Sequence, residues 1–281
     1  MLRTRLVTAL VLIALVVAAL FLLPPRGWGV AALAVIVVAA HEWARLSGFA
    51  PRTHLLFIIG IVGVGMGLLY APASGFARGW PAGIVLATCG AGALFWLLAA
   101  PLWLQRRWPT MRSLPMVASG WIVLIGAWMA LVELQSRSPW LVLAAMAVVW
   151  IADSAAYFSG RAFGRRKLAP EISPGKTWEG VYGALAGVMV YAVCLLPFAR
   201  DGGFTPALDA VTVALWLGFV LIVAAVSILG DLFESLQKRN AGVKDSGNLL
   251  PGHGGVLDRI DALLAAMPLS ALAAQLFLAK N

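Results

Sequence analysis

Residues 210–261 decide the fold and read AVTVALWLGFVLIVAAVSILGDLFESLQKRNAGVKDSGNLLPGHGGVLDRID. Residues 210–230 carry no charged side chain, and an α-helix needs roughly 20 apolar residues to cross a bilayer. The polar run that follows, from Gly230 to Asp261, holds five of the chain's 12 acidic residues and four of its 21 basic ones. Because charge beside a membrane span is costly to keep, we interpret this run as a candidate functional site.

The composition indicates a membrane protein. Of the 281 residues, 62% are hydrophobic and 12% are charged, whereas a soluble protein has about 25% charged residues. We therefore predict an all-α, polytopic protein with about nine transmembrane helices, forming one integral membrane domain over residues 1–281. Residues 1–150 are expected to be mainly scaffold and residues 151–281 to carry the chemistry, because Glu42 and Glu133 are the only acidic residues before residue 153.

Three other interpretations are disfavoured: nucleic-acid binding, a disulfide framework and a zinc site. The net charge of +9 would suggest nucleic acid in a soluble protein, but here the basic residues fall in short loops between spans, so no nucleic acid is expected. Cys89 and Cys194 both lie in apolar stretches without metal-binding spacing, which excludes disulfide and zinc frameworks.

Nine apolar segments approach the length of a span: residues 5–23, 28–44, 54–71, 82–104, 115–133, 139–158, 179–198, 210–232 and 260–279. The first is interpreted as a retained span, and the second, interrupted by His41 and Glu42, is expected to tilt or to stop near an interface. The N-terminus and every second loop hold 16 of the 21 Lys and Arg residues. The positive-inside rule then places the N-terminus and the polar run in the cytoplasm and the C-terminus outside.

Asp231, Glu234, Ser235 and Lys238 are spaced by three, four and seven residues, which places them on one helix face. Carboxylates beside basic residues suit a divalent cation with a phosphate-rich ligand. A solvated helix end with local ion pairs would give the same pattern.

A glycine-rich turn, residues 251–255, precedes Asp258 and Asp261. Its glycines permit close approach of the backbone to a ligand, and Asp258 could cap the helix that follows. Asp231 and Asp258 belong to consecutive spans that meet at one membrane face, so a two-carboxylate metal site is possible.

A third polar block begins with Asp153 inside a span, where an acid usually faces a polar cavity. The segment Ser173-Pro-Gly-Lys-Thr177 is superficially similar to a phosphate-binding loop. We reject that interpretation because the first glycine of the motif is missing and no strand is expected before it.

The polar run resembles the C-terminal signature of the phosphatidate cytidylyltransferases, also called CDP-diacylglycerol synthases. The match covers 27 residues and reads Ser235-x2-Lys238-Arg239-x4-Lys244-Asp245-x-Gly247-x2-Leu250-Pro251-x-His253-Gly254-Gly255-Val256-x-Asp258-Arg259-Ile260-Asp261. The block from Asp153 to Gly180 resembles a second stretch of that family. Gln237 departs from the pattern, because the family usually has an apolar residue there, and a local effect is expected.

The resemblance implies an enzyme of a bacterial-type inner membrane that converts CTP and phosphatidate into CDP-diacylglycerol and pyrophosphate in phospholipid biosynthesis. It implies Mg²⁺, a potassium ion beside it, membrane lipids as partners and a homodimer. Asp231 and Asp258 would bind the metal, with Glu234 and Asp261 as further candidate ligands. Lys238 and Arg239 would join the two aspartates in catalysis. The residues expected to bind substrates are Asp153, Lys176, Ser235, Lys244, Asp245, His253 and Arg259. A CTP-dependent polyprenol-type lipid kinase and a membrane transporter remain the alternatives.

Overall fold

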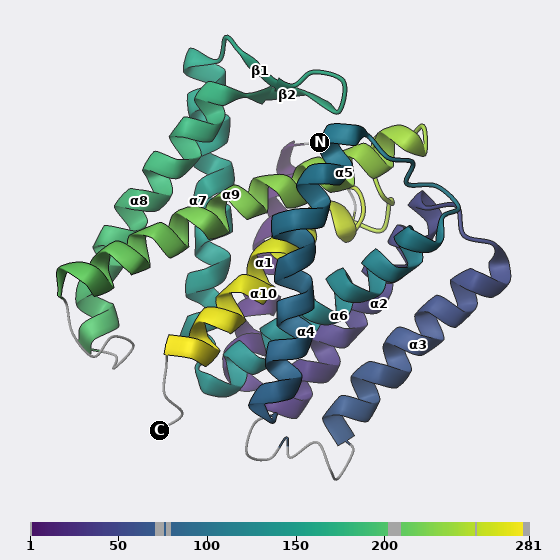
Figure 1. Ribbon diagram of the computed structural model, residues 1–281, viewed down its shortest axis with the longest axis horizontal. Helices are drawn as coiled ribbons and strands as arrows, with labels where there is room; N and C mark the ends of the chain where they lie inside the picture. The colour runs from purple at the N-terminus through teal and green to yellow at the C-terminus, as the bar shows by residue number, and fades with distance from the viewer. Residues whose placement is uncertain (1, 71–75, 77–79, 202–208, 251, 278–281) are drawn as a thin grey trace.

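The computed structural model describes residues 2–70, 76, 80–201, 209–250 and 252–277 as a bundle of helices (Figure 1). In chain order these helices are α1 (Leu2–Leu22), α2 (Pro25–Leu46), α3 (Pro51–Tyr70), α4 (Ala82–Leu94), α5 (Ala100–Arg106), α6 (Leu114–Arg137), α7 (Pro139–Phe163), α8 (Trp178–Asp201), α9 (Ala210–Asn240) and α10 (Leu257–Phe277). A π-helical turn, η3 (Phe95–Ala99), joins α4 to α5 without a break. Each of the nine predicted segments therefore corresponds to one continuous helical rod, and the all-α class is confirmed.

Among the described residues, seven helices are long and apolar enough to cross a membrane. They are α2, α3, the α4–α5 rod, α6, α7, α8 and α9, while α1 adds a shorter apolar stretch, Leu10–Leu22. The predicted count of about nine is thus approximate. A membrane side is predicted for some residues that lie outside the described part of the chain, namely Arg78, Pro251, Lys280 and the loop of residues 202–208.

Most helices extend a few residues beyond their predicted segments, and α9 differs most. His41 and Glu42 do not end α2, which continues to Leu46. Helix α9 is 31 residues long and continues to Asn240, eight residues beyond the predicted span. At about 1.5 Å per residue, α9 is about 46 Å long and exceeds the roughly 30 Å of a bilayer core. Its last turns therefore extend beyond the apolar layer and carry polar residues.

Helix α10 runs through the middle of the bundle and packs against α4, α6 and α9 (Figure 1). The indole nitrogen of Trp96 donates to the carbonyl of Leu264 at 3.1 Å, which fixes α10 against the α4–α5 rod. Beside it, Phe233 of α9 packs among aromatic rings of Trp43, Phe95, Trp96 and Trp103, with centroids 5.5–6.0 Å away. These contacts hold the polar end of α9 rigidly in the bundle.

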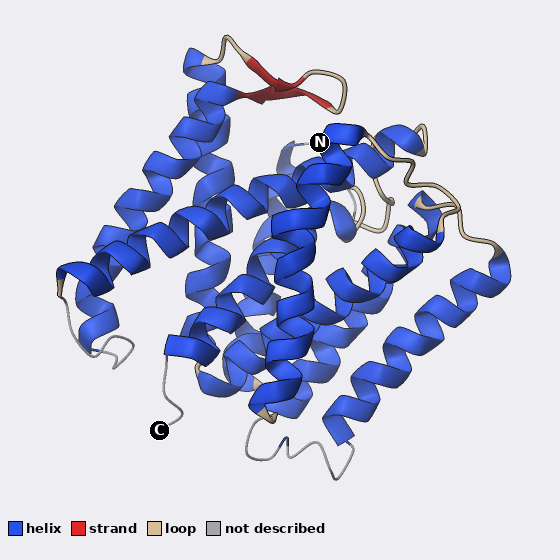
Figure 2. Cartoon of the chain, viewed as in Figure 1, coloured by secondary structure: helices blue, strands red, loops and turns tan. Residues whose placement is uncertain are grey.

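A small antiparallel hairpin, which was not predicted, follows α7 (Figure 2). Its strands are β1 (Lys167–Ala169) and β2 (Ser173–Thr177), so the phosphate-loop-like segment is itself a strand and a strand does precede it. An extended strand cannot wrap around a phosphate, so the rejection of a phosphate loop stands. Strands of three and five residues are too short to give a period that sequence analysis detects.

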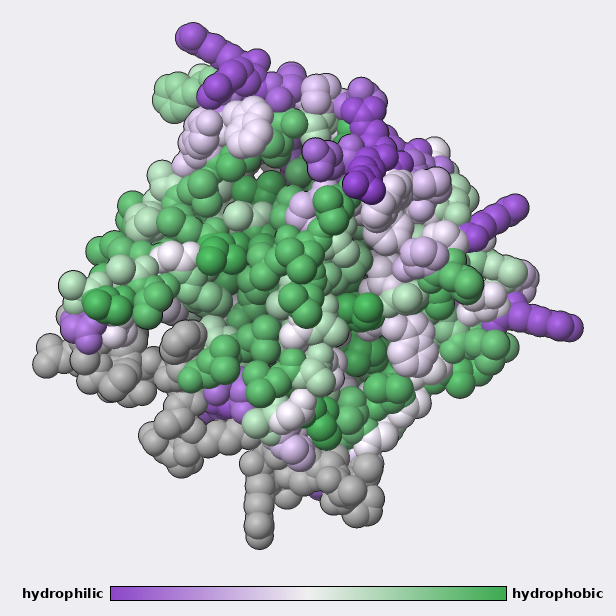
Figure 3. All heavy atoms as spheres, in the orientation of Figure 1, coloured by the Kyte–Doolittle hydropathy of each residue, from purple (hydrophilic) through white to green (hydrophobic). Residues whose placement is uncertain are grey.

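On the face that Figure 3 shows, hydrophobic residues cover most of the middle of the bundle, and hydrophilic residues gather mainly at the end that carries the hairpin. Exposed basic residues at this end include Arg161, Arg165, Arg166 and Lys167. The polar run and the hairpin therefore lie at one end of an apolar bundle.

Candidate active site

The last turns of α9 carry the first part of the site. Asp231 Oδ1 accepts a hydrogen bond from Ser235 Oγ at 3.3 Å, and Lys238 Nζ lies 2.5 Å from Glu234 Oε2. The four side chains share one helix face, as their spacing predicts.

Asp258, in the first turn of α10, is surrounded by donors. Its Oδ2 accepts from Ser246 N at 2.9 Å, Ser246 Oγ at 3.0 Å and Gly255 N at 2.8 Å. Burial alone would raise the pKa of Asp258, but hydrogen bonds from Lys238 and Gly255 outweigh it and lower the pKa to about 2. A Cβ at Gly254, where φ is +81°, would lie 2.6 Å from Asp258 Oδ2, so both the backbone conformation and the available space require glycine. Asp258 is therefore an ionised, firmly held carboxylate.

One ammonium group joins α9 to α10. Lys238 Nζ lies 2.7 Å from Asp258 Oδ1 while it also contacts Glu234. The exposed fractions of the three side chains are 13% for Lys238, 3% for Glu234 and 5% for Asp258. Removing one member of such a buried set leaves an uncompensated charge, so the three residues act as a unit.

The hairpin supplies a second lysine. Lys176 Nζ lies 2.6 Å from Asp231 Oδ2, and these side chains are 23% and 33% exposed. Asp153 of α7 lies beside this pair, close enough to interact electrostatically with both members. Asp231 is thus the carboxylate at which α7, α9 and the hairpin meet, and it is more open to solution than Asp258.

Asp261 completes the cluster at the crossing of α9 and α10. A Cβ at Gly230 would lie 2.6 Å from the carbonyl oxygen of Asp261, which shows how closely the two backbones approach. The Asp261 carboxylate is near enough to those of Asp231 and Glu234 for their charges to repel one another. We name Asp153, Asp231, Glu234, Asp258 and Asp261 the carboxylate cluster. In the described structure its ion pairs are with two lysines, Lys176 and Lys238, so the cluster holds more carboxyl groups than ammonium groups.

Carboxylate oxygens are hard donors and suit a divalent cation. Within the described ranges, no group of three or more His, Cys, Asp or Glu side chains is arranged to hold a metal by itself. Mg²⁺ commonly takes one or two carboxylates and fills its shell with water and substrate phosphates, so a pair of aspartates suffices. Asp231 has the more open oxygens, whereas Asp258 Oδ2 is committed to three protein donors.

The remaining predicted residues surround the cluster at varied distances. Arg239 points toward the hairpin, where its Nε donates to the carbonyl of Ile172 at 3.1 Å. Lys244, Asp245 and Arg259 are exposed and form no ion pair with the cluster in the part of the chain that the structure describes, and His253 is half-buried in the turn. The structure thus brings Lys176, Ser235 and Lys238 to the carboxylate cluster, to which Asp153 itself belongs. It leaves the other predicted binding residues at the rim.

Gln237 is completely buried, and its amide nitrogen and oxygen find no hydrogen-bond partner among the described residues. Burying an amide without partners is costly, so an apolar side chain would suit this position better.

Glu42 belongs to the site, although sequence analysis did not place it there. This residue of α2 is 3% exposed, and its carboxylate accepts hydrogen bonds from Val256 N, Leu257 N and Ser246 Oγ. The available signal was an acidic residue inside an apolar segment. No spacing rule could connect it to partners more than 200 residues away.

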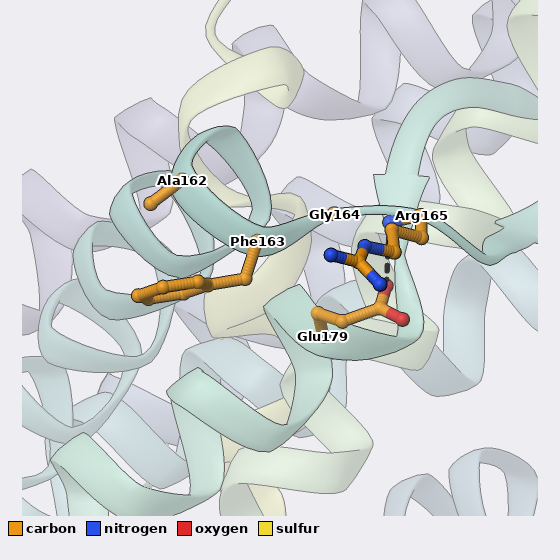
Figure 4. A pocket seen from close by; sticks show the side chains of 5 residues that line it. All are labelled: Ala162, Phe163, Gly164, Arg165 and Glu179. Carbon is orange, nitrogen blue, oxygen red and sulfur yellow. Dashed lines mark hydrogen bonds between the residues drawn. The ribbon is translucent and has the colours of Figure 1, made fainter.

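A surface hollow of about 400 Å³ lies nearby, where α7 ends and α8 begins (Figure 4). Phe163, Gly164, Arg165 and Glu179 line it, together with Ala162. The Glu179 carboxylate accepts the backbone N–H of Arg165 at 3.0 Å and so fixes the turn that leads to the hairpin. The carboxylate cluster does not line this hollow.

Comparison with known proteins identifies the family of the chain. The model of the cytidylyltransferase family matches residues 3–277. A phosphatidate cytidylyltransferase of Pseudomonas aeruginosa is 43% identical over 96% of both chains, and one of Haemophilus influenzae is 37% identical over 95% of this chain and 96% of its own. One of Thermotoga maritima is 45% identical over 43% of this chain and 44% of its own. The chain is therefore a member of the cytidylyltransferase family.

Proposed function

We propose that the protein is a phosphatidate cytidylyltransferase, which transfers CMP from CTP to phosphatidate and releases pyrophosphate. The observation that carries the proposal is the 43% identity over 96% of both chains to a protein of that name. The geometry supports it, because a cluster of acids and lysines lies at one end of an apolar bundle. A lipid phosphate anchored in a bilayer and a nucleotide from solution can meet at such a place.

The reaction depends more on electrostatic stabilisation of its phosphate groups than on a protein nucleophile. A phosphate oxygen of phosphatidate attacks the α-phosphorus of CTP, a new P–O bond forms, and the bond between the α-phosphorus and the bridging oxygen breaks as pyrophosphate leaves. Both reactants are anions, and phosphoryl chemistry of this kind depends on positioning and electrostatic stabilisation. Lys176 and Lys238 already hold ammonium groups at the cluster, and Arg239 lies beside the hairpin. We propose that these cations offset the charge of the two phosphate groups.

Mg²⁺ is proposed as the cofactor, held by Asp231 and Asp258, with Glu234 and Asp261 as further candidate ligands. When bound, it would neutralise phosphate oxygens and the departing pyrophosphate. The donor set fits, because Asp231 is partly open and the cluster holds more carboxylates than lysines. A potassium ion remains a prediction from the family resemblance.

The membrane setting rests on the seven helices long and apolar enough to span a bilayer. We propose an inner-membrane location with the N-terminus, the carboxylate cluster and the hairpin on the cytoplasmic side, where CTP is available. The exposed basic residues near the hairpin support that orientation. A homodimer remains a prediction.

A pyrophosphate-release assay tests the function. Purified protein in detergent should release pyrophosphate from CTP only when phosphatidate and Mg²⁺ are both present. The matched control is diacylglycerol, which has the same tails but no phosphate. Release that is independent of phosphatidate, or equal with diacylglycerol, would contradict the proposal.

A further inference from the structure

Glu42 connects the N-terminal half of the bundle to the segment that carries Asp258. Its Oε1 accepts from Val256 N at 3.0 Å, and its Oε2 accepts from Leu257 N at 2.7 Å and Ser246 Oγ at 2.9 Å. Val256 N and Leu257 N lie at the N-terminus of α10, where backbone donors lack helical partners and an acidic group is stabilising. Thus a side chain of α2 caps the helix on which Asp258 stands.

The segment is shaped to accept this carboxylate. A Cβ at Gly255 would lie 2.5 Å from Glu42 Oε2, and one at Gly247 would lie 2.5 Å from Glu42 Oε1. Real Cβ atoms do not approach oxygen so closely, so the two glycines form a cradle that any other residue would fill. The fit is tight on both sides of the carboxylate.

Ser246 links the two acids directly. Its hydroxyl is 2.9 Å from Glu42 Oε2 and 3.0 Å from Asp258 Oδ2, and its single proton serves one of them at a time. Its backbone N–H donates to Asp258 Oδ2 as well. A displacement of Glu42 is therefore passed to Asp258 through one buried side chain.

We infer that Glu42 is a positioning residue for Asp258 and that it clamps residues 246–257 in the conformation that the reaction needs. The inference rests on the proposed function, because it assigns a role within that reaction. The requirement is for a carboxylate, since both Glu42 oxygens face backbone N–H donors. An amide at this position would turn its NH₂ group toward one of those donors in either orientation, and a hydrogen bond would become a repulsive contact.

Glu42→Gln tests the inference, with Glu133→Gln as the matched control. Glu133 is also a buried acid, 1% exposed, but it pairs with Arg137 at the other end of α10. In Glu42→Gln, the backbone amides of residues 246–258 should exchange hydrogen at least tenfold faster, while the rest of the protein keeps its protection. The Mg²⁺ concentration for half-maximal rate should rise about 10- to 100-fold, a typical cost of losing a group that orients a metal-binding side chain. Glu133→Gln should change neither quantity.

Gly247→Ala, whose Cβ would meet the Glu42 carboxylate first, gives a second, independent variant that decides the question if Glu42→Gln does not fold. It displaces the Glu42 carboxylate without removing it and should reproduce both effects, whereas Gly90→Ala, which meets open space, should have none. Unchanged exchange over residues 246–258 in both site variants, or faster exchange throughout the protein, would overturn the inference. If the wild-type protein showed no cytidylyltransferase activity, the proposed function would fail while the exchange measurement still decided whether Glu42 clamps the segment.

Discussion

Replacing each of the two proposed metal ligands, Asp231 and Asp258, by asparagine should affect turnover similarly and stability differently. Both substitutions should lower turnover about 10²- to 10³-fold, which is a common cost of removing a charge-stabilising group. Their effects on stability should differ. The Asp258 side chain is 5% exposed and holds Lys238 and three further donor contacts, whereas Asp231 is 33% exposed and pairs with Lys176 near the surface.

The size of the difference follows from the pKa of Asp258, which is lowered from 3.8 to about 2 in the folded protein. Since one pKa unit corresponds to about 1.4 kcal/mol, the ionised form contributes about 2.5 kcal/mol to folding at neutral pH. In a protein of this size, about 1 kcal/mol shifts the melting temperature by about 2–4 °C, so Asp258→Asn should melt about 5–10 °C lower. A partly exposed pair such as Asp231–Lys176 contributes at most about 1 kcal/mol, so Asp231→Asn should melt within about 4 °C of wild type.

Thermal scans by tryptophan fluorescence, run beside the turnover assay in one detergent, measure both effects. A carboxyl group whose pKa is lowered on folding stabilises the fold at pH values above its pKa in the unfolded state. That contribution disappears as the pH falls through its pKa in the folded state. The melting difference between wild type and Asp258→Asn should therefore be constant above about pH 4 and shrink as the pH falls toward about 2. Equal melting shifts in the two variants, or wild-type turnover in Asp231→Asn, would refute the reasoning.

Three further outcomes are expected. Single cysteines that replace Val243 or Val211, near opposite ends of α9, should react differently in a protein without other cysteines. An impermeant thiol reagent added to intact cells should label the Val211→Cys variant and not the Val243→Cys variant. Labelling of Val243→Cys alone would overturn the proposed orientation. Gln237→Leu should raise the melting temperature and leave turnover unchanged, because it removes a buried amide that has no hydrogen-bond partner among the described residues; a lower melting temperature would contradict this. Gly230→Ala should destabilise the protein by about 1–3 kcal/mol and reduce turnover because it separates α9 from α10, whereas Gly218→Ala, which meets open space on the same helix, should do neither.

The helices and one face of the site could be predicted from sequence, because both depend on local periodicity. Apolar stretches of span length gave the helical rods, and the spacing of Asp231, Glu234, Ser235 and Lys238 gave their common face on α9. Neither result needs information about which helices are neighbours.

Contacts between distant segments could not be predicted. Lys238 could pair with Glu234 by spacing alone, but its contact with Asp258 depends on how α9 crosses α10 at Gly230. Glu42 was assigned to the scaffold with the rest of residues 1–150, and no spacing rule connects it to partners that follow more than 200 residues later. The hairpin was missed since its strands are short, and with it the pairing of Lys176 with Asp231. In each case tertiary packing, which no periodicity reports, decided the outcome.

The fate of the α-phosphorus of CTP tests the central claim most directly. A cytidylyltransferase keeps that phosphorus in the lipid product and releases the β- and γ-phosphorus as pyrophosphate, whereas a lipid kinase places the γ-phosphorus on the lipid. Purified protein with phosphatidate, Mg²⁺ and α-labelled CTP should give a labelled product that extracts into chloroform, and γ-labelled CTP should give none. Asp231→Asn, purified in the same way, should lose the signal and so exclude a contaminating enzyme. Lipid labelled from the γ position, or no labelled lipid from either nucleotide across several detergents and potassium concentrations, would contradict the account.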